Sequence, residues 1–287
     1  MPTTPALHLT VAPHTYPQAP KSGNPAMPST PERFTGKIAL VTGATGGIGE
    51  ATVRRLLDEG GAVMAVGRDP DRLAGTLARL DCPARLAGCL AQADDEAAMA
   101  AAVAATVERF GGLDICVANA GFEGVIHRSL ELQEREDVDA VLRTNVVGVW
   151  LAIKHSIAPM RRRGGGAIVA LASMAAQIGF AGAGPYIASK HAVAGLVKTA
   201  ALELGVDRIR VNAVAPGPIE NRMMRSIETQ IAPGDPAAVH ESLRSKLALG
   251  RYGSNAEVAA FIAFLASDAA SFCTGGIHLI DGGYCAA

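Results

Sequence analysis

Two residues that could transfer a proton, Tyr186 and Lys190, stand four positions apart in the stretch GPYIASKHAVAGL. This spacing predicts that both side chains lie on one face of a helix. Because a neighbouring ammonium group favours the phenolate, we expect Lys190 to lower the pKa of Tyr186. A tyrosine with a lowered pKa can donate and accept a proton near neutral pH.

Ser173 ends the apolar stretch AIVALAS, which predicts a buried strand. Ligands bind at the carboxyl edge of an open parallel sheet, so a serine there can hydrogen-bond a substrate oxygen. A lone serine in this position is more often a helix cap, and a lone tyrosine–lysine pair is more often a surface contact. The two features together, downstream of a nucleotide-binding turn, predict a catalytic site.

The predicted nucleotide-binding turn is VTGATGGIG, between a buried strand and an amphipathic helix. Glycine lets a phosphate approach the backbone closely, and the N-terminus of the following helix attracts an anion. A simple tight turn is the alternative, but the position after the first strand favours a dinucleotide. The residues that we expect to contact the dinucleotide are Gly43, Thr45, Gly46, Gly47, Ile48 and Gly49.

The end of the second predicted strand, VGRDP, bears on the choice between NADP and NAD. Gly67 stands where a carboxylate would bind the ribose hydroxyls of NAD. The next residue, Arg68, can pair with the 2′-phosphate of NADP through charge-assisted hydrogen bonds. The alternative is a solvated arginine for which Asp69 competes. We therefore expect NADP in preference to NAD.

From Phe34 onward, apolar stretches rich in β-formers alternate with helical stretches. This alternation predicts parallel strands joined by right-handed crossovers, and continuous apolar runs are typical of strands covered on both faces. We predict one α/β, Rossmann-like, doubly wound parallel sheet of about seven strands with helices on both faces. A long helix is expected to end near Arg162, and residues 216–250 are expected to be irregular.

The first 33 residues are rich in proline and have no periodic apolar pattern, which predicts a disordered arm over residues 1–33. This arm is either a flexible tail or the product of an upstream start codon, with Met27 as the physiological first residue. Residues 34–287 are predicted to form a single dinucleotide-binding catalytic domain, because no boundary interrupts the alternation.

The formal net charge of −1 gives no electrostatic reason to expect nucleic acid or an anionic membrane as partner. No apolar run reaches the roughly 20 residues that span a bilayer. The five scattered cysteines form no CxxC pair, so we interpret them as reduced thiols of a cytoplasmic protein and expect no metal site.

Six motifs follow one another along the chain: TGATGGIG, ANAG at 118–121, TNVVG with Asn145, Ser173 with YIASK, RVNAVAPG at 210–217 and SFCTGGIHLIDGG at 271–283. By these motifs the chain resembles the short-chain dehydrogenase/reductases over about residues 34–284. The resemblance implies the strand order 3-2-1-4-5-6-7 and a nicotinamide cofactor, NADP or NAD.

The resemblance also implies a role for each matching residue. Tyr186 is the catalytic acid/base, Lys190 lowers its pKa and holds the nicotinamide ribose, and Ser173 orients the substrate. Asn145 holds a water in a proton relay through Lys190, and Asn119 ties the fourth strand to its neighbours near the cofactor. The other implied cofactor contacts are Ala120, Gly121, Pro216, Gly217, Ile219 and Asn221.

The implied activity is that of an NAD(P)-dependent oxidoreductase that transfers a hydride between nicotinamide and a ketone or secondary alcohol. We expect an NADPH-linked reductase of 3-oxoacyl-like carbonyl compounds that assembles as a homotetramer. An NAD-dependent alcohol or sugar dehydrogenase is the alternative, and a non-catalytic nucleotide-sensing protein is a third hypothesis that retention of Asn145, Ser173, Tyr186 and Lys190 disfavours.

Residues 216–250 are expected to form a substrate lid. Methionines suit irregular apolar shapes, and this segment combines Met223 and Met224 with Arg222 and Arg225. The arginines either face a polar or anionic substrate or are simply solvated. Other candidates for the substrate lining are Phe122, Glu123, Gln177, Phe180 and Trp150.

Overall fold

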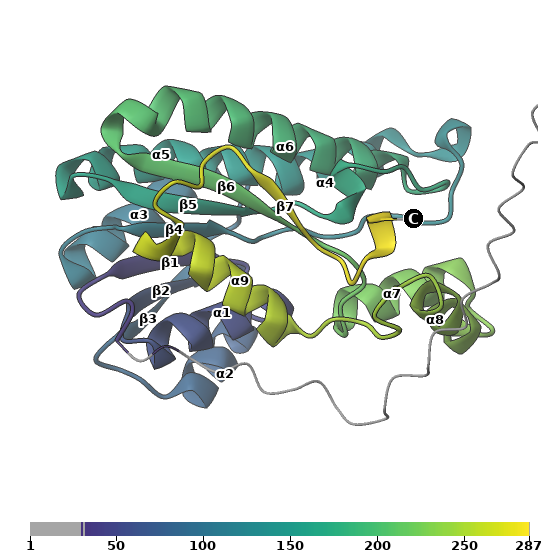
Figure 1. Ribbon diagram of the computed structural model, residues 1–287, viewed down its shortest axis with the longest axis horizontal. Coiled ribbons are helices and arrows are strands. Elements are labelled where there is room, and N and C mark those ends of the chain that lie inside the picture. The colour runs from purple at the N-terminus through teal and green to yellow at the C-terminus, as the bar shows by residue number, and fades with distance from the viewer. Residues whose placement is uncertain (1–29, 31, 287) are drawn as a thin grey trace, which may run out of the picture.

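The structure, a computed structural model, describes residue 30 and residues 32–286, and these contain a seven-stranded parallel sheet (Figure 1). The strands are β1 (Ile38–Thr42), β2 (Ala62–Gly67), β3 (Leu86–Leu90), β4 (Ile115–Ala118), β5 (Gly166–Leu171), β6 (Ile209–Pro216) and β7 (Ile277–Ile280). Their spatial order is β3-β2-β1-β4-β5-β6-β7. The fold class and the strand order are therefore confirmed.

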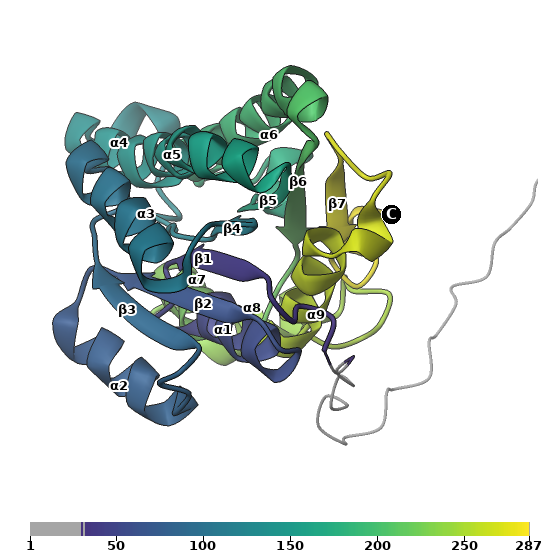
Figure 2. The ribbon, with the colours of Figure 1, turned by 90° about the vertical axis from the view of Figure 1, so that its left-hand side faces the viewer.

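Helices cover both faces of the sheet (Figure 2). One face packs against α1 (Gly47–Asp58), α2 (Pro70–Leu80) and α9 (Asn255–Ala266), and the other packs against α3 (Glu96–Phe110), α5 (Gly148–Arg163) and α6 (Gly184–Leu204). The central strands β1 and β4 are buried along their whole length, which explains their continuous apolar sequences. Two apolar cores result, one on each side of the sheet.

The order of the strands creates an opening at the carboxyl edge of the sheet. Strand β1 pairs with β2 on one side and with β4 on the other, so the chain reverses its direction of travel across the sheet after β3. The loops that leave β1 and β4 therefore diverge, and ligands of open α/β sheets bind at such a point.

Two segments differ from what the sequence predicts. The long helix ending near Arg162 is divided into α4 (Arg135–Leu142), a π-helical turn (Arg143–Val147) and α5. The stretch 216–250, expected to be irregular, instead folds largely into α7 (Arg222–Ile231) and α8 (Pro236–Arg244). Asn221 and Asp235 cap these two helices, since their side chains accept hydrogen bonds from Met224 N and Ala238 N.

Most of the predicted N-terminal arm, residues 1–29 and 31, lies outside the described residues. At its end the chain is attached to the domain, because Arg33 Nε lies 3.0 Å from the buried carboxylate of Glu59, which also pairs with Arg55. None of the helices in the described residues is long and apolar enough to cross a membrane.

Replacing Gly49 by alanine is expected to destabilise the domain. A Cβ atom at Gly49 would lie 2.1 Å from the carbonyl oxygen of Gly43, so either the glycine-rich turn or α1 must move. Overpacking typically costs about 1–3 kcal/mol, and contact with backbone, which cannot rotate away, favours the upper end of this range. Chemical denaturation measures the loss in the free energy of unfolding.

Gly195→Ala is the matched control, because a Cβ atom at this position on α6 meets nothing within 4 Å. Alanine in an exposed helix is favoured over glycine by up to about 1 kcal/mol, so this variant should be as stable as the parent or more so. Equal stability of the Gly49 and Gly195 variants would contradict the close packing of α1 on the turn.

Candidate active site

A cleft of about 930 Å³ opens at the carboxyl edge of the sheet. Most residues that the sequence predicts for the site line it: Gly43, Thr45, Gly46, Gly47, Ile48, Arg68, Asn119, Ala120, Gly121, Ser173, Tyr186, Lys190, Pro216, Gly217, Ile219 and Asn221. Gly49 and Asn145 lie behind this lining. The cleft is therefore built from segments spread over residues 42–255.

The glycine-rich turn forms one end of the cleft. Gly43 and Gly47 have φ values of +62° and +52°, a conformation that favours glycine. A Cβ atom at Gly43 would approach Asn119 and Ala120 to 2.9 Å, whereas none at Gly47 would meet an atom closer than 3.6 Å. The turn is thus closely packed at Gly43 and open at Gly47, where the N-terminus of α1 faces the cleft. This geometry fits a dinucleotide phosphate.

Asn119 joins the turn to the fourth strand. Its side-chain Nδ2 donates hydrogen bonds of 3.0 Å to the carbonyl oxygens of Thr42 and Gly43, and its backbone N–H donates to Thr42 Oγ1. These contacts agree with the role that the family resemblance implies for Asn119, because they hold β4 against β1 beside the cleft.

Ser173, Tyr186 and Lys190 lie together at the end of β5. The Ser173 hydroxyl accepts a bond from Ala175 N at 3.2 Å and donates to Pro216 O at 3.5 Å, and it lies close enough to the phenol of Tyr186 to lower its pKa. Lys190 is buried, and its Nζ donates a 2.7 Å hydrogen bond to the carbonyl oxygen of Leu171, at 5.6 Å from the centre of the Tyr186 ring. Two hydroxyls and an ammonium group thus share the middle of the cleft.

The expectation that Lys190 lowers the pKa of Tyr186 is wrong, because this pKa is raised above its ordinary value. Burial raises the pKa of Tyr186 to about 12, with a further contribution from the charge of Glu123, while the bond to Ser173 acts in the opposite direction. Burial also lowers the pKa of Lys190 to about 8. The two shifts share a cause, because removal from water disfavours the charged form of each group. The spacing of the two residues in the sequence does not reveal how far the fold removes them from water.

Asn145 lies in the π-helical turn and is fully buried. Its side chain accepts from Phe122 N and donates to Phe122 O, both at 3.0 Å, and donates to Ser189 Oγ at 3.1 Å. The amide is therefore occupied in fixing the loop after β4 against α6, and its link to Lys190 through a water stays a prediction.

Two arginines flank the glycine-rich turn at the end of the cleft near β2. Arg68 is exposed, lines the cleft and makes no ion pair with the part of the chain that the structure describes. Asp69 does not compete for it, because the Asp69 side chain accepts from Arg72 N and caps α2. Arg72, which was not predicted from the sequence, also lines the cleft and donates to Thr45 O at 3.1 Å. Arg72 could have been identified as a candidate from the sequence, because it stands four residues after Arg68.

The wall opposite the turn consists of the segment after β6. Gly217 is required there, since a Cβ atom would lie 2.8 Å from Cα of Asp281. Asn221 faces the cleft, but its Oδ1 accepts from Met224 N and its Nδ2 donates to Asn255 Oδ1 at 3.3 Å. Its amide is thus already engaged in the cap of α7, which competes with the expected contact to the cofactor.

Helix α7 covers the remaining part of the cleft and contributes Arg222, Met223, Met224 and Arg225 to its lining. Phe122, Glu123 and Phe180, expected to line the substrate region, do so, whereas Gln177 and Trp150 do not. Trp150 is 43% exposed on α5.

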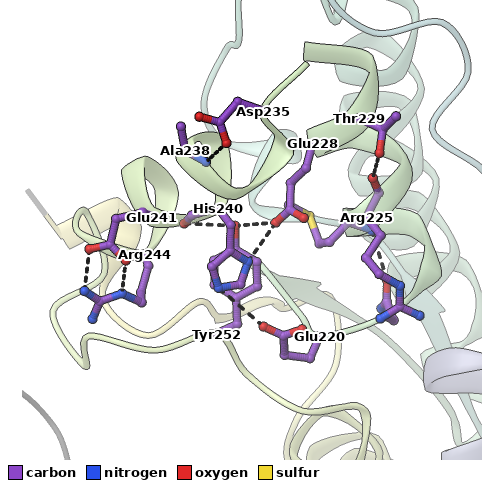
Figure 3. A network of polar contacts seen from close by, with 12 residues as sticks. Glu220, Arg225, Glu228, Thr229, Asp235, Ala238, His240, Glu241, Arg244 and Tyr252 are labelled. Carbon is purple, nitrogen blue, oxygen red and sulfur yellow. Dashed lines mark hydrogen bonds and ion pairs between the residues drawn. The ribbon is translucent and has the colours of Figure 1, made fainter. Parts of the chain in front are cut away.

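A polar network holds α7 in place (Figure 3). The buried carboxylate of Glu228 on α7 accepts a 2.9 Å bond from the Tyr252 hydroxyl and lies 3.0 Å from Nδ1 of His240 on α8. The His240 ring packs on Tyr252 with centroids 4.1 Å apart, and its Nε2 lies 3.7 Å from Glu220. The network ties α7 and α8 to the segments before and after them, so α7 keeps a defined position over the cleft.

The donors present suit an organic cofactor better than a metal ion. The described residues include no group of three or more His, Cys, Asp or Glu side chains that could hold a metal. The open glycine-rich turn and the two arginines instead fit the phosphates of a dinucleotide.

Comparison with known proteins agrees with this site. The sequence model of the family described as Enoyl-(Acyl carrier protein) reductase matches residues 43–285. Cis-4-hydroxycyclohexanecarboxylate dehydrogenase of Sinomonas cyclohexanicum is 39% identical over 260 residues, which are 89% of this chain and 99% of that protein. The 3-oxoacyl-acyl-carrier-protein reductase of Thermotoga maritima is 35% identical over 254 residues, which are 88% of this chain and 98% of that protein.

The crystal structure of levodione reductase superposes with a TM-score of 0.85 at 36% identity, covering 88% of this chain and 99% of that one. Identity of this extent over nearly the whole domain, together with the site geometry, identifies the family. The chain belongs to the short-chain dehydrogenase/reductases, NAD(P)-dependent oxidoreductases that act on ketones and alcohols.

Proposed function

We propose that this protein is an NADP-linked reductase of a ketone, working reversibly on the corresponding secondary alcohol, with Tyr186 as the proton donor. One observation carries the proposal: Ser173, Tyr186 and Lys190 meet in the cleft that also contains the open glycine-rich turn. A dinucleotide that places its phosphates at the turn would extend toward these three side chains.

The chemistry divides between the cofactor and the chain. Bound nicotinamide supplies the hydride for the carbonyl carbon, or accepts it in the oxidative direction. Ser173 and Tyr186 hydrogen-bond the carbonyl oxygen, and Tyr186 gives it a proton as negative charge develops there. Because its pKa is raised to about 12, Tyr186 carries this proton at neutral pH, which suits the direction of reduction.

Lys190 contributes a buried positive charge. With a pKa of about 8, the group is predominantly protonated at neutral pH, and its bond to Leu171 O keeps it close to the Tyr186 ring. A cation at this position stabilises an oxygen that becomes negative in the transition state.

Arg68 and Arg72 support NADP as the cofactor. The two guanidinium groups lie on the same side of the glycine-rich turn, and Arg68 has all its donors available to the cleft, as far as the described residues go. A 2′-phosphate there would gain two charge-assisted partners. An NAD-dependent enzyme would instead place a carboxylate at the position that Gly67 occupies.

The substrate region favours a compact apolar ketone. Its lining includes Ile126, Met174, Phe180, Met224 and Ile227. One relative acts on a hydroxycyclohexanecarboxylate and another on levodione by their names. We therefore propose a cyclic ketone or secondary alcohol as the substrate class, in place of a long 3-oxoacyl chain.

A homotetramer in the cytoplasm completes the proposal. Trp150 on α5 and Leu202 on α6 are exposed apolar side chains, at 43% and 85%, and contact between subunits at these helices would remove them from water. Sedimentation equilibrium at micromolar concentration should give the mass of four chains, and a monomer mass would exclude this assembly.

Tyr186→Phe should lower the turnover number for ketone reduction by at least about a hundredfold, because the proton donor is lost while the ring remains. Steady-state oxidation of NADPH, followed by absorbance, measures the effect. The dissociation constant of the dinucleotide, from fluorescence titration, should change by less than about threefold. A variant with near-normal turnover would remove Tyr186 from the mechanism.

Arg68→Ala should weaken NADPH binding about tenfold to thirtyfold, the effect of losing one charged hydrogen-bond partner, and leave NADH binding unchanged. Arg79→Ala is the control, because Arg79 lies near the end of the following helix, α2, and pairs with Glu50 instead of lining the cleft. Equal weakening of both dinucleotides by Arg68→Ala would count against recognition of the 2′-phosphate.

A further inference from the structure

The part of the cleft under α7 combines apolar side chains with two arginines. The apolar side chains there come from the loop after β4, the segment after β5 and α7 itself. Arg222 and Arg225 also line this part of the cleft, three residues apart on α7, so they lie on neighbouring positions of one helix face.

Arg222 is held in position by a buried acid. Its NH2 and NH1 atoms lie 3.3 and 3.5 Å from the carboxylate of Glu123, whose side chain is 6% exposed. The Arg222 side chain is 62% exposed. A guanidinium group has five donors, and Glu123 takes two of them through long bonds. The other three have no partner among the described residues and can bind a ligand in the cleft.

Arg225 has no such partner among the residues that the structure describes. It is exposed and lines the cleft, and its side chain forms no ion pair there. The other acids of the lid are engaged elsewhere: Glu228 is buried against His240 and Tyr252, and Glu220 faces His240 (Figure 3).

The two arginines differ in how they are paired. The carboxylates of Glu123 and Glu220 both line the cleft, but Glu123 pairs with Arg222 and Glu220 lies 3.7 Å from His240. Arg225 is left without an ion-pair partner among the described residues. The carboxylate of a substrate would supply that partner, because guanidinium groups bind carboxylates through paired hydrogen bonds.

We propose that the substrate is an apolar, ring-sized keto acid, or the matching hydroxy acid, whose carboxylate is bound by Arg222 and Arg225 at the lid. Its carbonyl oxygen lies at Ser173 and Tyr186, so the substrate spans the cleft from the reacting group to α7. This inference rests on the proposed ketone reductase activity and adds the carboxylate as the feature by which substrates are distinguished.

Three ketones of the same ring size test the proposal: 4-oxocyclohexanecarboxylate, the corresponding carboxamide and 4-methylcyclohexanone. With NADPH, the carboxylate should have a KM at least about tenfold below that of the carboxamide, the usual effect of one charge-assisted contact. Arg222→Gln should raise the KM of the carboxylate about tenfold or more relative to the KM of both neutral ketones.

Arg135→Gln is the matched control, since Arg135 is an exposed arginine on α4 that pairs with Asp139 away from the cleft. It should leave all three KM values unchanged. The double variant Arg222→Gln/Arg225→Gln should remove the preference for the carboxylate completely.

Equal KM values for the carboxylate and the carboxamide in the parent protein would overturn the carboxylate site, as would an equal effect of Arg222→Gln on charged and neutral ketones. In both cases turnover of the neutral ketones would leave the reductase activity standing. Better turnover of a pantetheine 3-oxoacyl thioester than of the keto acid would also overturn the proposal.

Calorimetry separates this inference from the failure of the activity itself. Cyclohexanecarboxylate, which has no carbonyl to reduce, should bind to the protein with NADP at least about tenfold more tightly than cyclohexanecarboxamide, and Arg222→Gln should abolish the difference. If none of the ketones is reduced, this binding measurement still decides the carboxylate site: equal affinities overturn it.

Discussion

The removal of Tyr186 and Lys190 from water in one cleft is the constraint on which the rest of the site depends. The buried ammonium group of Lys190 needs acceptors, and Leu171 O supplies one at 2.7 Å because β5 ends beside α6. The pKa of the partly buried phenol is raised to about 12, so Tyr186 stays protonated at neutral pH, as its proposed role of proton donor requires. Ser173 lies beside this phenol, and we propose that the two hydroxyls together define where a substrate oxygen binds. Asn145, through Phe122 and Ser189, keeps the neighbouring loop and helix in register around them.

The cleft has two ends with different chemistry, and separate parts of the chain form them. The glycine-rich turn, Arg68 and Arg72 offer donors and positive charge to phosphates. At the other end, α7 offers apolar surface with two arginines, and the buried carboxylates of Glu123 and Glu228 determine how that helix lies. The groups at the first end follow strands β1 and β2, where dinucleotides bind in such sheets. The groups at the second end lie on α7 and the loop after β4, in the segment that we propose as the substrate lid.

Much of this arrangement could be predicted from the sequence, because local patterns encode it. Continuous apolar runs predict the buried strands, the glycine spacing predicts the turn, and the four-residue spacing places Tyr186 and Lys190 on one helix face. The pKa of Tyr186 could not be predicted correctly, since it depends on how much water the fold removes. The pairing of Glu123 with Arg222, 99 residues apart, depends on tertiary structure in the same way. Helices α7 and α8 could in principle have been predicted from their N-caps, Asn221 and Asp235. The mixed composition of the segment obscured this signal.

The most direct test of the account is the ionisation of Tyr186 in the ligand-free protein. Carbon-13 labelling of the tyrosine ring, with the signal assigned by comparison with Tyr186→Phe, allows the phenol to be titrated by NMR. The account predicts that this signal keeps the shift of the neutral phenol up to about pH 10, since burial raises the pKa to about 12. Ionisation between pH 6 and about pH 9 would contradict it, because Lys190 would then stabilise the phenolate in the free protein.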